Sequence, residues 1–568
     1  MRILLLTHSF NSLTQRFYLE LVERGHDVTV EFDINDAVTI EAVNIFGPDL
    51  VIAPFLKRAI PDAVWRHVLC LVVHPGPPGD RGPTSLDWAI LDGARDWGVT
   101  VLQATGELDG GPVWAWRPFK MREATKSSVY RNEVTDAALA AVEEALVRFE
   151  AGLRVAPDQR AFAGIAPRWR NAMKQADRKI DWDRDDTETV LRKIAAGDGT
   201  PGVRDRIGDC DVFLYNAKKA SVAPSGARPG EIIARSHCAV MRATLDGAVW
   251  IGHTKLAQRK AIKLPATEGL RRQIEDLPVT EEPKDILYEE GGGVGYLHFT
   301  FLNGAMGVDA CQRLLAAFRD AAARQVRVLV LMGGPDFWSN GLDLNEIEAA
   351  DSAADQSWAN INAIDDLAEA IVRNTDQVVI SALGGNAGAG GVFLARCADE
   401  VWLRHGVILN PHYKDMGNLF GSELWTYLLP KHVGEAHARQ ITQQRLPMGA
   451  GEALRLGLAD RVIAAPRDRF GESVAEAART IALDPGLTER LADKARQRHA
   501  DEAAKPLAAY RADELRRMYR NFYGFDPSYH VARYNFVHKV PKSRTPVTIA
   551  HHRNRARGPA SVAEEAAQ

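Results

Sequence analysis

A glycine-rich loop between two apolar runs is the first stretch of the sequence that suggests chemistry. It reads Gly384-Gly-Asn-Ala-Gly-Ala-Gly-Gly391, after the strand-like run 377–381 and before the apolar run 392–395. Glycines in this position leave backbone N–H groups uncovered at the start of a helix, where they bind negative charge. No Gly-Lys-Ser or Gly-Lys-Thr ending follows, as a nucleotide site would require. We therefore expect the loop to hold a developing oxyanion; a glycine-lined helix packed closely on a sheet is the alternative.

A second turn of the same kind lies upstream of this loop. The run 326–332 has the composition of a buried strand and leads into Ser339-Asn-Gly-Leu-Asp-Leu344. In this order, the two segments resemble the oxyanion-hole segments of the crotonase (enoyl-CoA hydratase/isomerase) superfamily. The run 297–306 resembles the opening strand and turn of that family. The resemblance covers roughly residues 285–465 and implies a spiral ββα fold.

The resemblance also implies a substrate. In the family, the backbone N–H groups at the positions of Leu342 and Gly390 would hold the carbonyl oxygen of a coenzyme A (CoA) thioester. Hydratases of the family work with two carboxylates, and those positions are Phe393 and His412 here. Addition of water to an enoyl thioester is therefore not expected.

Tyr413 and Glu423 are the residues we expect to replace the missing acid and base. A glutamate desolvated among apolar neighbours has a raised pKa and can move a proton near neutral pH, and a neighbouring phenol can relay it. Two alternatives stay open: Glu423 as a helix-start carboxylate beside an N-cap at Ser422, and Tyr413 as a core aromatic. His412 and Lys414 are reserve candidates.

A histidine at the end of a predicted strand is the second candidate for chemistry. His74 follows the apolar run 70–73, and Asp109 lies in a later glycine-containing turn. Imidazole titrates near neutral pH and suits general acid or base work, with a carboxylate to orient it. A lone histidine at a strand end is more often structural, so its surroundings decide.

Those surroundings resemble the 10-formyltetrahydrofolate-dependent formyltransferases. The shared motifs are His74 with a proline-rich loop, Arg81-Gly82, Trp88-Ala-Ile90 and Asp109-Gly-Gly-Pro112. The resemblance implies that His74 is the general acid or base and that Asp109 orients it or relays its proton.

The same resemblance implies a folate site and leaves its acceptor open. Phe55, Leu56, Thr105 and Glu107 fall where the family holds the pterin. The asparagine that the family carries two residues before the histidine is Val72 here. Its amide helps to position the formyl group while an amine attacks, so an amine acceptor is in doubt. A thiol is more nucleophilic and needs less help.

The whole chain, with both halves in this order, resembles the hydrogenase maturation proteins of the HypX (HoxX) type. That resemblance implies a bifunctional enzyme, a formyltransferase and a formyl-CoA decarbonylase of lyase type. The formyl group of 10-formyltetrahydrofolate would pass to CoA, and formyl-CoA would then split into carbon monoxide and CoA. Carbon monoxide would become a ligand of the iron in nickel-iron hydrogenase, with the maturation machinery of the hydrogenase large subunit as a partner.

Polar residues that open the first helix are the candidates for the CoA phosphates. They are Ser9, Asn11, Gln15 and Arg16, with Arg131 and basic residues of the C-terminal segment. A capped surface helix is the alternative for Ser9 and Asn11. One CoA whose pantetheine arm reaches both sites through a closed interior would protect formyl-CoA from water.

Alternating strands and helices predict the α/β class and a multidomain chain. From residue 1 to about residue 122 the alternation predicts a doubly wound parallel sheet, with chemistry at the carboxyl ends of its strands. We expect a formyltransferase domain (1–155), a small barrel-like domain (156–264), a linker (265–284), a crotonase-like domain (285–465), a helical extension (466–552) and a disordered tail (553–568).

Composition excludes several classes of function. The net charge of −4 disfavours nucleic acid as the main partner. The five cysteines are scattered, so neither a disulfide framework nor a metal site is expected. The apolar run at the N-terminus is too short for a signal peptide, and no run approaches the ~20 residues of a membrane span. We expect a cytoplasmic protein without membrane contact.

Two rival interpretations remain at this level. One is a formyltransferase that acts on an amine and is fused to a non-catalytic, CoA-binding crotonase-like scaffold. The other is a scaffold without activity that binds CoA and folate and docks a partner protein. The formyl acceptor and the oligomeric state do not follow from the sequence.

Overall fold

The computed structural model describes residues 1–162, 168–222 and 226–557 and divides into two compact units. Unit 1 comprises residues 1–283 and the C-terminal segment from residue 542, and unit 2 comprises residues 284–541. The predicted linker is not irregular throughout. It overlaps β14 (Leu264–Pro265) and contains α8 (Ala266–Gly269), which pack against β13.

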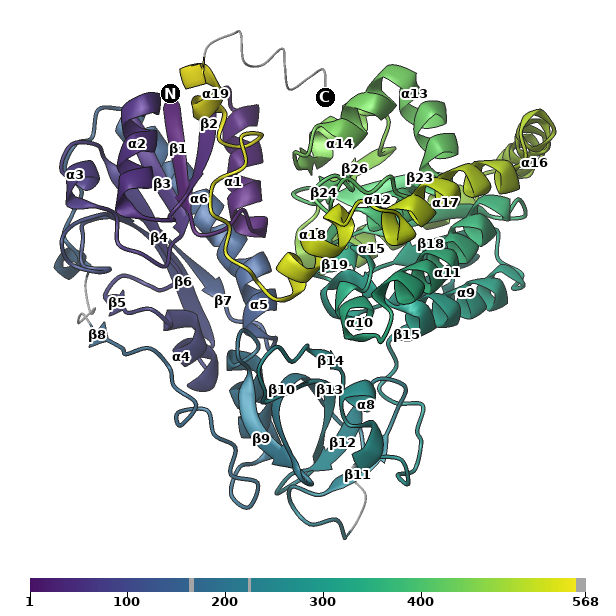
Figure 1. Cartoon of the computed structure of the whole chain (residues 1–568), viewed down its shortest axis with the longest axis horizontal. Coiled ribbons are helices and arrows are strands. Elements are labelled where there is room, and N and C mark those ends of the chain that lie inside the picture. Colours follow the sequence, from purple (N-terminus) through teal and green to yellow (C-terminus); the bar gives the residue numbers. More distant parts are fainter. Residues whose placement is uncertain (163–167, 223–225, 558–568) are drawn as a thin grey trace. The chain divides into compact units, whose positions relative to one another are not determined.

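Unit 1 begins with a six-stranded sheet in the order β2-β1-β3-β4-β6-β7 (Figure 1). The first four strands are parallel, as predicted, whereas β6 and β7 run antiparallel to their neighbours. The strands are β1 (Arg2–Thr7), β2 (Asp27–Phe32), β3 (Leu50–Phe55), β4 (Cys70–His74), β6 (Asp96–Gln103) and β7 (Val113–Lys120). The doubly wound sheet is thus confirmed, with an antiparallel pair at one edge.

Helices cover both faces of this sheet. On one face α2 (Asp36–Phe46) and α3 (Asp62–Trp65) join a core of buried side chains from β1 and β3. Elsewhere α1 (Ser12–Glu23) packs beside α6 (Thr135–Glu150), which lies against β6 and β7. Because the first four strands are parallel, the segments after β1, β3 and β4 emerge at one edge.

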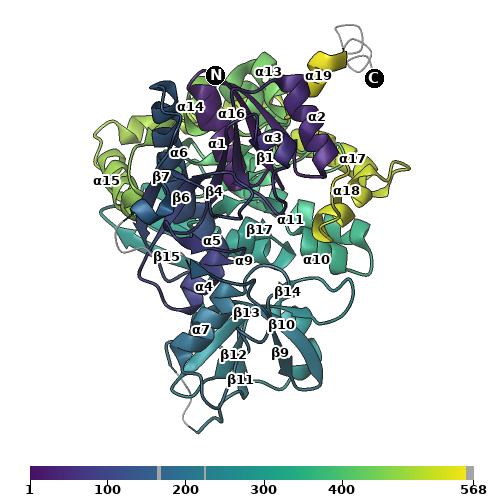
Figure 2. The ribbon, with the colours of Figure 1, turned by 90° about the vertical axis from the view of Figure 1, so that its left-hand side faces the viewer.

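The second part of unit 1 is an open antiparallel sheet, in the order β11-β12-β13-β10-β9 (Figure 2). Its elements are β9 (Val203–Ile207), β10 (Cys210–Lys219), β11 (Ile232–Arg235), β12 (Val240–Ala243), β13 (Ala248–Leu256) and α7 (Thr187–Ala196). The predicted barrel does not close in the described part of the chain, since β9 and β11 do not pair. Instead, α7 and α8 cover the apolar face of the sheet.

Unit 2 repeats a strand, a strand and a helix, as the crotonase-like prediction requires. The first strands of the repeats form a sheet in the order β15-β16-β18-β21-β23-β26, and the second strands form β19-β22-β24-β25 and β17-β20. The large sheet comprises β15 (Ile286–Gly291), β16 (Val294–Phe299), β18 (Val328–Met332), β21 (Val378–Leu383), β23 (Glu400–Arg404) and β26 (Arg461–Ile463). The short strands are β17 (Ala305–Met306), β19 (Phe337–Ser339), β20 (Gly341–Leu342), β22 (Asn386–Gly388), β24 (Ile408–Asn410) and β25 (Met448–Gly449), and the helices include α9 (Val308–Ala322), α10 (Leu344–Ala349), α11 (Ala353–Arg373), α12 (Gly390–Arg396), α13 (Trp425–Gln443) and α14 (Ala450–Leu456).

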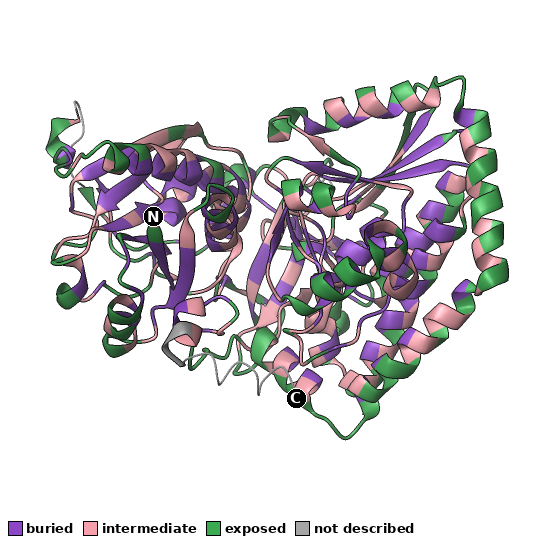
Figure 3. Ribbon diagram, turned by 90° about the horizontal axis from the view of Figure 1, so that it is seen from above, coloured by how far each residue is buried: buried purple, intermediate pink, exposed green. Residues whose placement is uncertain are grey.

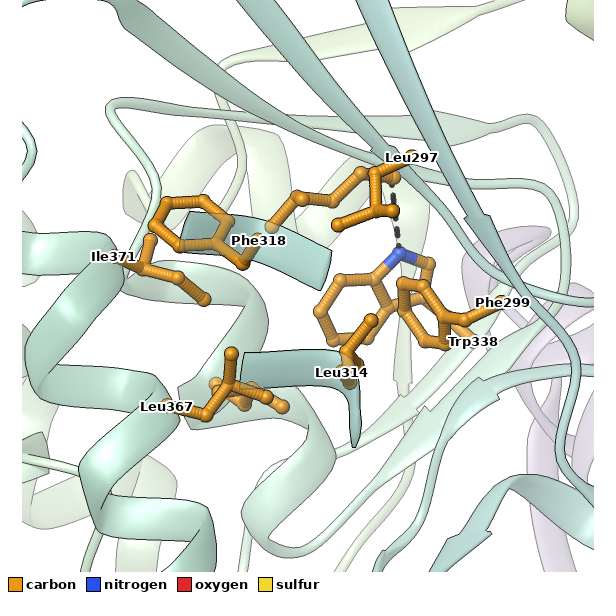
Figure 4. Close-up of a pocket in the computed structure, with 9 residues that line it drawn as sticks. Leu297, Phe299, Leu314, Phe318, Trp338, Leu367 and Ile371 are labelled. Carbon is orange, nitrogen blue, oxygen red and sulfur yellow. Dashed lines mark hydrogen bonds between the residues drawn. The ribbon is translucent and has the colours of Figure 1, made fainter. Parts of the chain in front are cut away.

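A small apolar cavity of about 10 Å³ lies in the core of unit 2 (Figure 4). Leu297, Phe299, Leu314, Phe318, Leu331, Trp338, Leu367, Ile371 and Leu394 line it. The indole N–H of Trp338 donates to the carbonyl of Leu331 at 3.3 Å. A buried water needs two or more polar partners, so this cavity is a dry packing defect.

Four helices follow the repeats in the described chain, within the range given to the predicted helical extension. They are α15 (Phe470–Ala482), α16 (Leu487–Ala504), α17 (Leu507–Tyr523) and α18 (Ser528–Val537). Helix α15 packs on the large sheet, whereas α17 packs on α11 and α13. Figure 3 colours the residues by burial and shows that the strands are buried, whereas helices along one side are exposed on their outer surface.

The C-terminal strap, residues 542–557, folds onto the edge strand β2 of unit 1. The N–H of Val30 donates to the carbonyl of Ile549 at 3.0 Å, and the N–H of Phe32 donates to Thr545 Oγ1 at 2.8 Å. The strap ends in α19 (His551–Arg557). The strap therefore covers otherwise unpaired backbone groups of β2, and the predicted disordered tail from residue 553 begins inside α19. Residues 558–568 lie outside the described chain.

A buried carboxylate fastens this strap. Glu31 is fully buried, and its Oε2 lies 3.1 Å from His552 Nε2 and 2.6 Å from Arg553 Nη2. The hydroxyl of Thr545 donates to Glu31 Oε1. Burial opposes ionisation, but hydrogen bonds from His552, Thr545 and Arg553 lower the pKa of Glu31.

Replacing Glu31 with glutamine should weaken the strap. We expect the local unfolding free energy of β2, measured by amide hydrogen exchange, to fall by about 3 kcal/mol at neutral pH, because His552 and Arg553 lose their buried counter-charge. Because the pKa of Glu31 is lower in the folded protein, its ionised form stabilises the fold at pH values above the unfolded pKa of about 4.3. That stabilisation is lost as the pH falls through the folded pKa, so the difference between wild type and Glu31→Gln should shrink in acid.

The matched control is Glu41→Gln. Glu41 pairs with the same Arg553 at 2.9 Å but is 56% exposed. We expect a change below about 0.5 kcal/mol, as for other exposed ion pairs. Equal losses in the two variants would contradict the fastening role of Glu31.

Candidate active sites

The histidine and aspartate predicted for the first site lie together. His74 ends β4 and is buried, and its Nδ1 lies 3.6 Å from Asp109 Oδ1. Asp109 has the left-handed φ of 51°, and its other oxygen accepts the N–H of Gly82 at 3.1 Å. The turn that contains Asp109 therefore aims its carboxylate at the imidazole.

A second carboxylate beside His74 was not predicted from the sequence. His74 Nε2 lies 3.0 Å from Asp80 Oδ2, and the hydroxyl of Ser85 donates to the same oxygen. A Cβ on Gly76 would lie 2.5 Å from both His74 Nε2 and Asp80 Oδ2, so only glycine fits there. The imidazole thus stands between two carboxylates. The sequence signal that could have identified Asp80 is an acidic residue inside the proline-rich loop after His74.

The two segments predicted for folate converge. Leu56, after β3, and Ala104, after β6, pack against the same apolar cluster. The N–H of Glu107 donates to Thr105 Oγ1 at 3.2 Å, and the Glu107 carboxylate pairs with Arg81 Nη2 at 2.8 Å. An apolar wall and a polar loop therefore adjoin, as a flat heterocycle with polar edges requires.

The residues predicted for CoA phosphates lie at the start of α1. Asn11 caps the helix, since its Oδ1 accepts the N–H of Thr14 at 3.0 Å, as in the alternative interpretation. The side-chain amide of Gln15 donates to the carbonyl of Phe10 at 3.0 Å. Arg16 pairs with Glu20 at 2.6 Å. The helix start therefore offers N–H groups and a cation, and the cation already has a carboxylate partner.

Tyr130 connects this helix start with the folate segment. Its ring centroid lies 6.2 Å from that of Phe55, and its phenol is hydrogen-bonded to Asn11. Arg131 is the next residue, and the carbonyl of Ser9 accepts the hydroxyl of Thr7 at 3.0 Å. The structure thus brings the predicted CoA and folate residues to neighbouring positions in unit 1.

The two predicted oxyanion segments of unit 2 touch each other. A Cβ on Gly341, where φ is 74°, would lie 3.2 Å from the backbone nitrogen of Gly390. Leu342 follows Gly341 in β20, and Gly390 is the first residue of α12. The N–H of a first helical residue has no carbonyl partner within its own helix.

Glu423 and Tyr413 meet at the same point. A Cβ on Gly390 would collide with Glu423 Oε1, so the carboxyl group lies directly against the Gly390 α carbon. The phenol of Tyr413 donates to Glu423 Oε2. Glu423 Oε1 is buried and has no hydrogen-bond partner in the described part of the chain. One oxygen of the base is held, and the other is available beside the oxyanion segments.

Burial sets the chemistry of this pair. Desolvation, reinforced by the charge of Asp365, raises the pKa of Glu423 to about 8, although the hydrogen bond from Tyr413 opposes the rise. Burial and the neighbouring Glu423 also raise the pKa of Tyr413 well above its ordinary value. Glu423 can therefore exchange a proton near neutral pH, and Tyr413 stays a phenol that donates.

The substituted family positions have changed character. Phe393 is fully buried and stacks under Tyr413, with ring centroids 5.1 Å apart. Burial lowers the pKa values of His412 and Lys414, and Arg445 lowers both further, although Asp415 opposes the shift of His412. The contacts described above place Tyr413 and Glu423 together beside Gly390.

Two further carboxyl groups close the site and were missed from the sequence. Asp365 of α11 and Glu514 of α17 are fully buried and accept N–H groups from the turn that contains Glu423. Glu514 shares the buried face of α17 with Leu507, Met518 and Phe522. A carboxylate on the otherwise apolar face of this predicted helix is the sequence signal that could have identified Glu514.

Two absences hold for the described residues only. Within 1–162, 168–222 and 226–557, no group of three or more His, Cys, Asp and Glu side chains is arranged to hold a metal ion. In the same ranges, no helix is long and apolar enough to cross a membrane.

Three family models match the chain in sequence order. The formyl transferase model covers residues 29–146, and the model of the formyl transferase C-terminal domain covers residues 172–268. The enoyl-CoA hydratase/isomerase model covers residues 302–526, so it includes α17. These matches agree with the two sites described above.

Individual relatives match over the whole length or over one half. A methionyl-tRNA formyltransferase of Kosmotoga olearia is 25% identical over 42% of this chain and 77% of its own. The crystal structure of HypX from Aquifex aeolicus in complex with tetrahydrofolic acid has a TM-score of 0.94 and 45% identity, and the match covers 97% of this chain and 99% of that one. The hydrogenase maturation factor HoxX of Bradyrhizobium diazoefficiens is 58% identical over 98% of both chains. The chain therefore belongs to the HypX (HoxX) family of hydrogenase maturation factors.

Proposed function

We propose that this protein makes carbon monoxide from the formyl group of 10-formyltetrahydrofolate, with CoA as the carrier. The observation that carries the proposal is the free oxygen of Glu423 beside Gly390, because it supplies a base at an oxyanion site without the carboxylates of a hydratase. The relative from Aquifex aeolicus, which binds tetrahydrofolic acid, supports the first substrate. The relative that is a hydrogenase maturation factor supports the iron of a nickel-iron hydrogenase as the destination of the carbon monoxide. We place the reaction in the cytoplasm.

The first step is formyl transfer in unit 1. The bond from the formyl carbon to N10 of folate breaks, and a bond to the CoA sulfur forms. His74 carries the thiol proton towards N10, and Asp109 orients the ring. Phe55, Leu56, Thr105 and Glu107 hold the folate, and Ser9, Asn11, Gln15, Arg16 and Arg131 hold the CoA phosphates. The thiolate suits a site in which Val72 replaces an amide, because sulfur attacks without that help.

The second step is decarbonylation in unit 2. Leu342 and Gly390 polarise the formyl oxygen with their N–H groups, and Glu423 takes the formyl proton. The C–H electron pair stays with carbon as the C–S bond breaks, which gives carbon monoxide and the thiolate of CoA. Tyr413 relays the proton to sulfur. Phe393 presents an apolar ring where a hydratase has a carboxylate, so no water is activated there.

Gas release tests the whole proposal. Purified protein is incubated with 10-formyltetrahydrofolate, with and without CoA, in haemoglobin solution. We expect the carbonmonoxy spectrum with CoA only. In Glu423→Gln, carbon monoxide release should fall about 1,000-fold while formyl-folate is still consumed, because the base is lost and the first site is intact. The exposed Glu435→Gln is the control. If the wild-type protein consumed 10-formyltetrahydrofolate and CoA without releasing carbon monoxide, or formylated an amine instead of CoA, the proposal would be refuted.

The second step should accelerate as the pH rises. Glu423 must be ionised to accept the formyl proton, and its raised pKa of about 8 keeps it protonated at lower pH. With supplied formyl-CoA, we expect the rate to rise about tenfold per pH unit up to about pH 8 and then to level off. The assay follows carbon monoxide release, corrected for spontaneous hydrolysis. A flat profile would contradict Glu423 as the base.

Asp80 should serve the first step alone. In Asp80→Asn the imidazole loses one of its two carboxylate neighbours, and we expect formyl transfer to CoA to fall about 100-fold. Gas release from supplied formyl-CoA should be unchanged. Asp92→Asn is the control, since Asp92 is 49% exposed and pairs with Arg170. Loss of both steps would mean that the variant disrupts folding instead.

A further inference from the structure

Three carboxyl groups are buried together in unit 2. Asp365 of α11, Glu423 of the turn before α13 and Glu514 of α17 each have no exposed surface. The N–H of Glu423 donates to Asp365 Oδ1 at 2.9 Å, and the N–H of Leu424 donates to Glu514 Oε2 at 3.0 Å. Two carboxyl groups thus hold the turn that presents the third.

This turn has a backbone conformation that side-chain contacts must maintain. Glu423 and Leu424 are both left-handed, with φ values of 60° and 59°. The left-handed conformation is strained for any residue other than glycine. Ser422 Oγ donates to Asp365 Oδ2 at 2.6 Å, and both the N–H and the hydroxyl of Thr426 donate to Glu514 Oε1, at 2.8 and 2.5 Å.

Helix α17 supplies several of these partners. Besides Glu514, it places Met518 Sδ 3.2 Å from the N–H of Gly421 and Asn521 Oδ1 3.2 Å from the N–H of Phe420. The turn is therefore held from a helix that follows the predicted crotonase-like domain.

The charges around Glu423 are mostly negative. It faces Tyr413, Asp365 and Glu514, and the thiols of Cys397 and Cys311 lie within its field. Arg511 Nε lies 3.8 Å from Asp365, but the same guanidinium also pairs with Asp366 at 2.7 Å and Glu369 at 3.1 Å. Its charge is therefore shared among three carboxylates and does not neutralise the cluster.

The direction of this effect is clear for all three groups. Burial raises the pKa of Asp365 to about 6 and that of Glu514 to about 8, with Asp365 adding to the rise for Glu514, and the charges of Asp365 and Glu514 both raise the pKa of Glu423. Removing one negative charge from the cluster should make the remaining groups ionise more easily.

We propose that Glu514, assisted by Asp365, is a positioning residue for Glu423: it fixes the left-handed turn and, through its charge, keeps Glu423 a strong base. This inference rests on the proposed decarbonylation. It makes α17 part of the second active site, although this helix follows the strand-strand-helix repeats of unit 2.

The test compares Glu514→Gln with Asp513→Asn. Asp513 is the preceding residue, is 48% exposed and pairs with Lys505. With supplied formyl-CoA, we expect the midpoint of the pH–rate profile to fall by about one unit in Glu514→Gln and the plateau to fall about tenfold, because the base is weaker. Asp513→Asn should match the wild type, and Glu514→Asp should restore most of the midpoint.

A second measurement separates this inference from the proposed function. The infrared carboxyl band that disappears in Glu423→Gln is titrated in the wild type and in Glu514→Gln. We expect the titration to move to lower pH in Glu514→Gln, whether or not the protein releases gas. An unmoved titration, or a uniform loss of rate at every pH, would overturn the positioning role. If Glu514→Gln does not fold, Asp365→Asn gives the same comparison.

Discussion

The burial of the Glu423 carboxyl group against Gly390 is the constraint on which unit 2 depends. A carboxylate without solvent costs several kcal/mol unless neighbours compensate, and one oxygen here has no partner. The surrounding structure supplies the compensation in separate parts: a phenol for the other oxygen, glycine where any side chain would collide, and helices that hold the turn. A site of this kind stores free energy that packing elsewhere must offset.

The first site follows a different physical rule. His74 is placed by the end of a parallel strand, and its partners come from two loops at the same edge of the sheet. Strand order therefore brings these loops to one edge of the sheet, where they meet the imidazole. Val72, where the formyltransferase pattern predicts asparagine, packs against the apolar cluster of this sheet.

Sequence patterns predicted the parts of the molecule that depend on local order. The glycine loop, the strand that ends at His74 and the amphipathic trailing helices need only neighbours in the chain, and the structure contains each of them. Asp365 and Glu514 were missed because their roles arise from distant segments that meet only after folding. Asp80 lies in the loop that follows His74, and it was missed because the sequence does not show that this loop turns back onto the imidazole. The open small sheet was missed for the same reason, since α7 and α8 cover its apolar face where a closed barrel was predicted.

The C-terminal strap has a consequence for how the protein is made. Strand β2 is synthesised near the beginning of the chain, whereas the residues that cover its edge are among the last described. A ribosome adds about 5–20 residues per second, so the sheet of unit 1 waits with an open edge while unit 2 emerges. Open strand edges are sites of mispairing between nascent chains. The protein is therefore expected to depend on chaperones during synthesis. A chain interrupted before residue 542 would keep this edge of β2 open, although every candidate site residue would already have been synthesised.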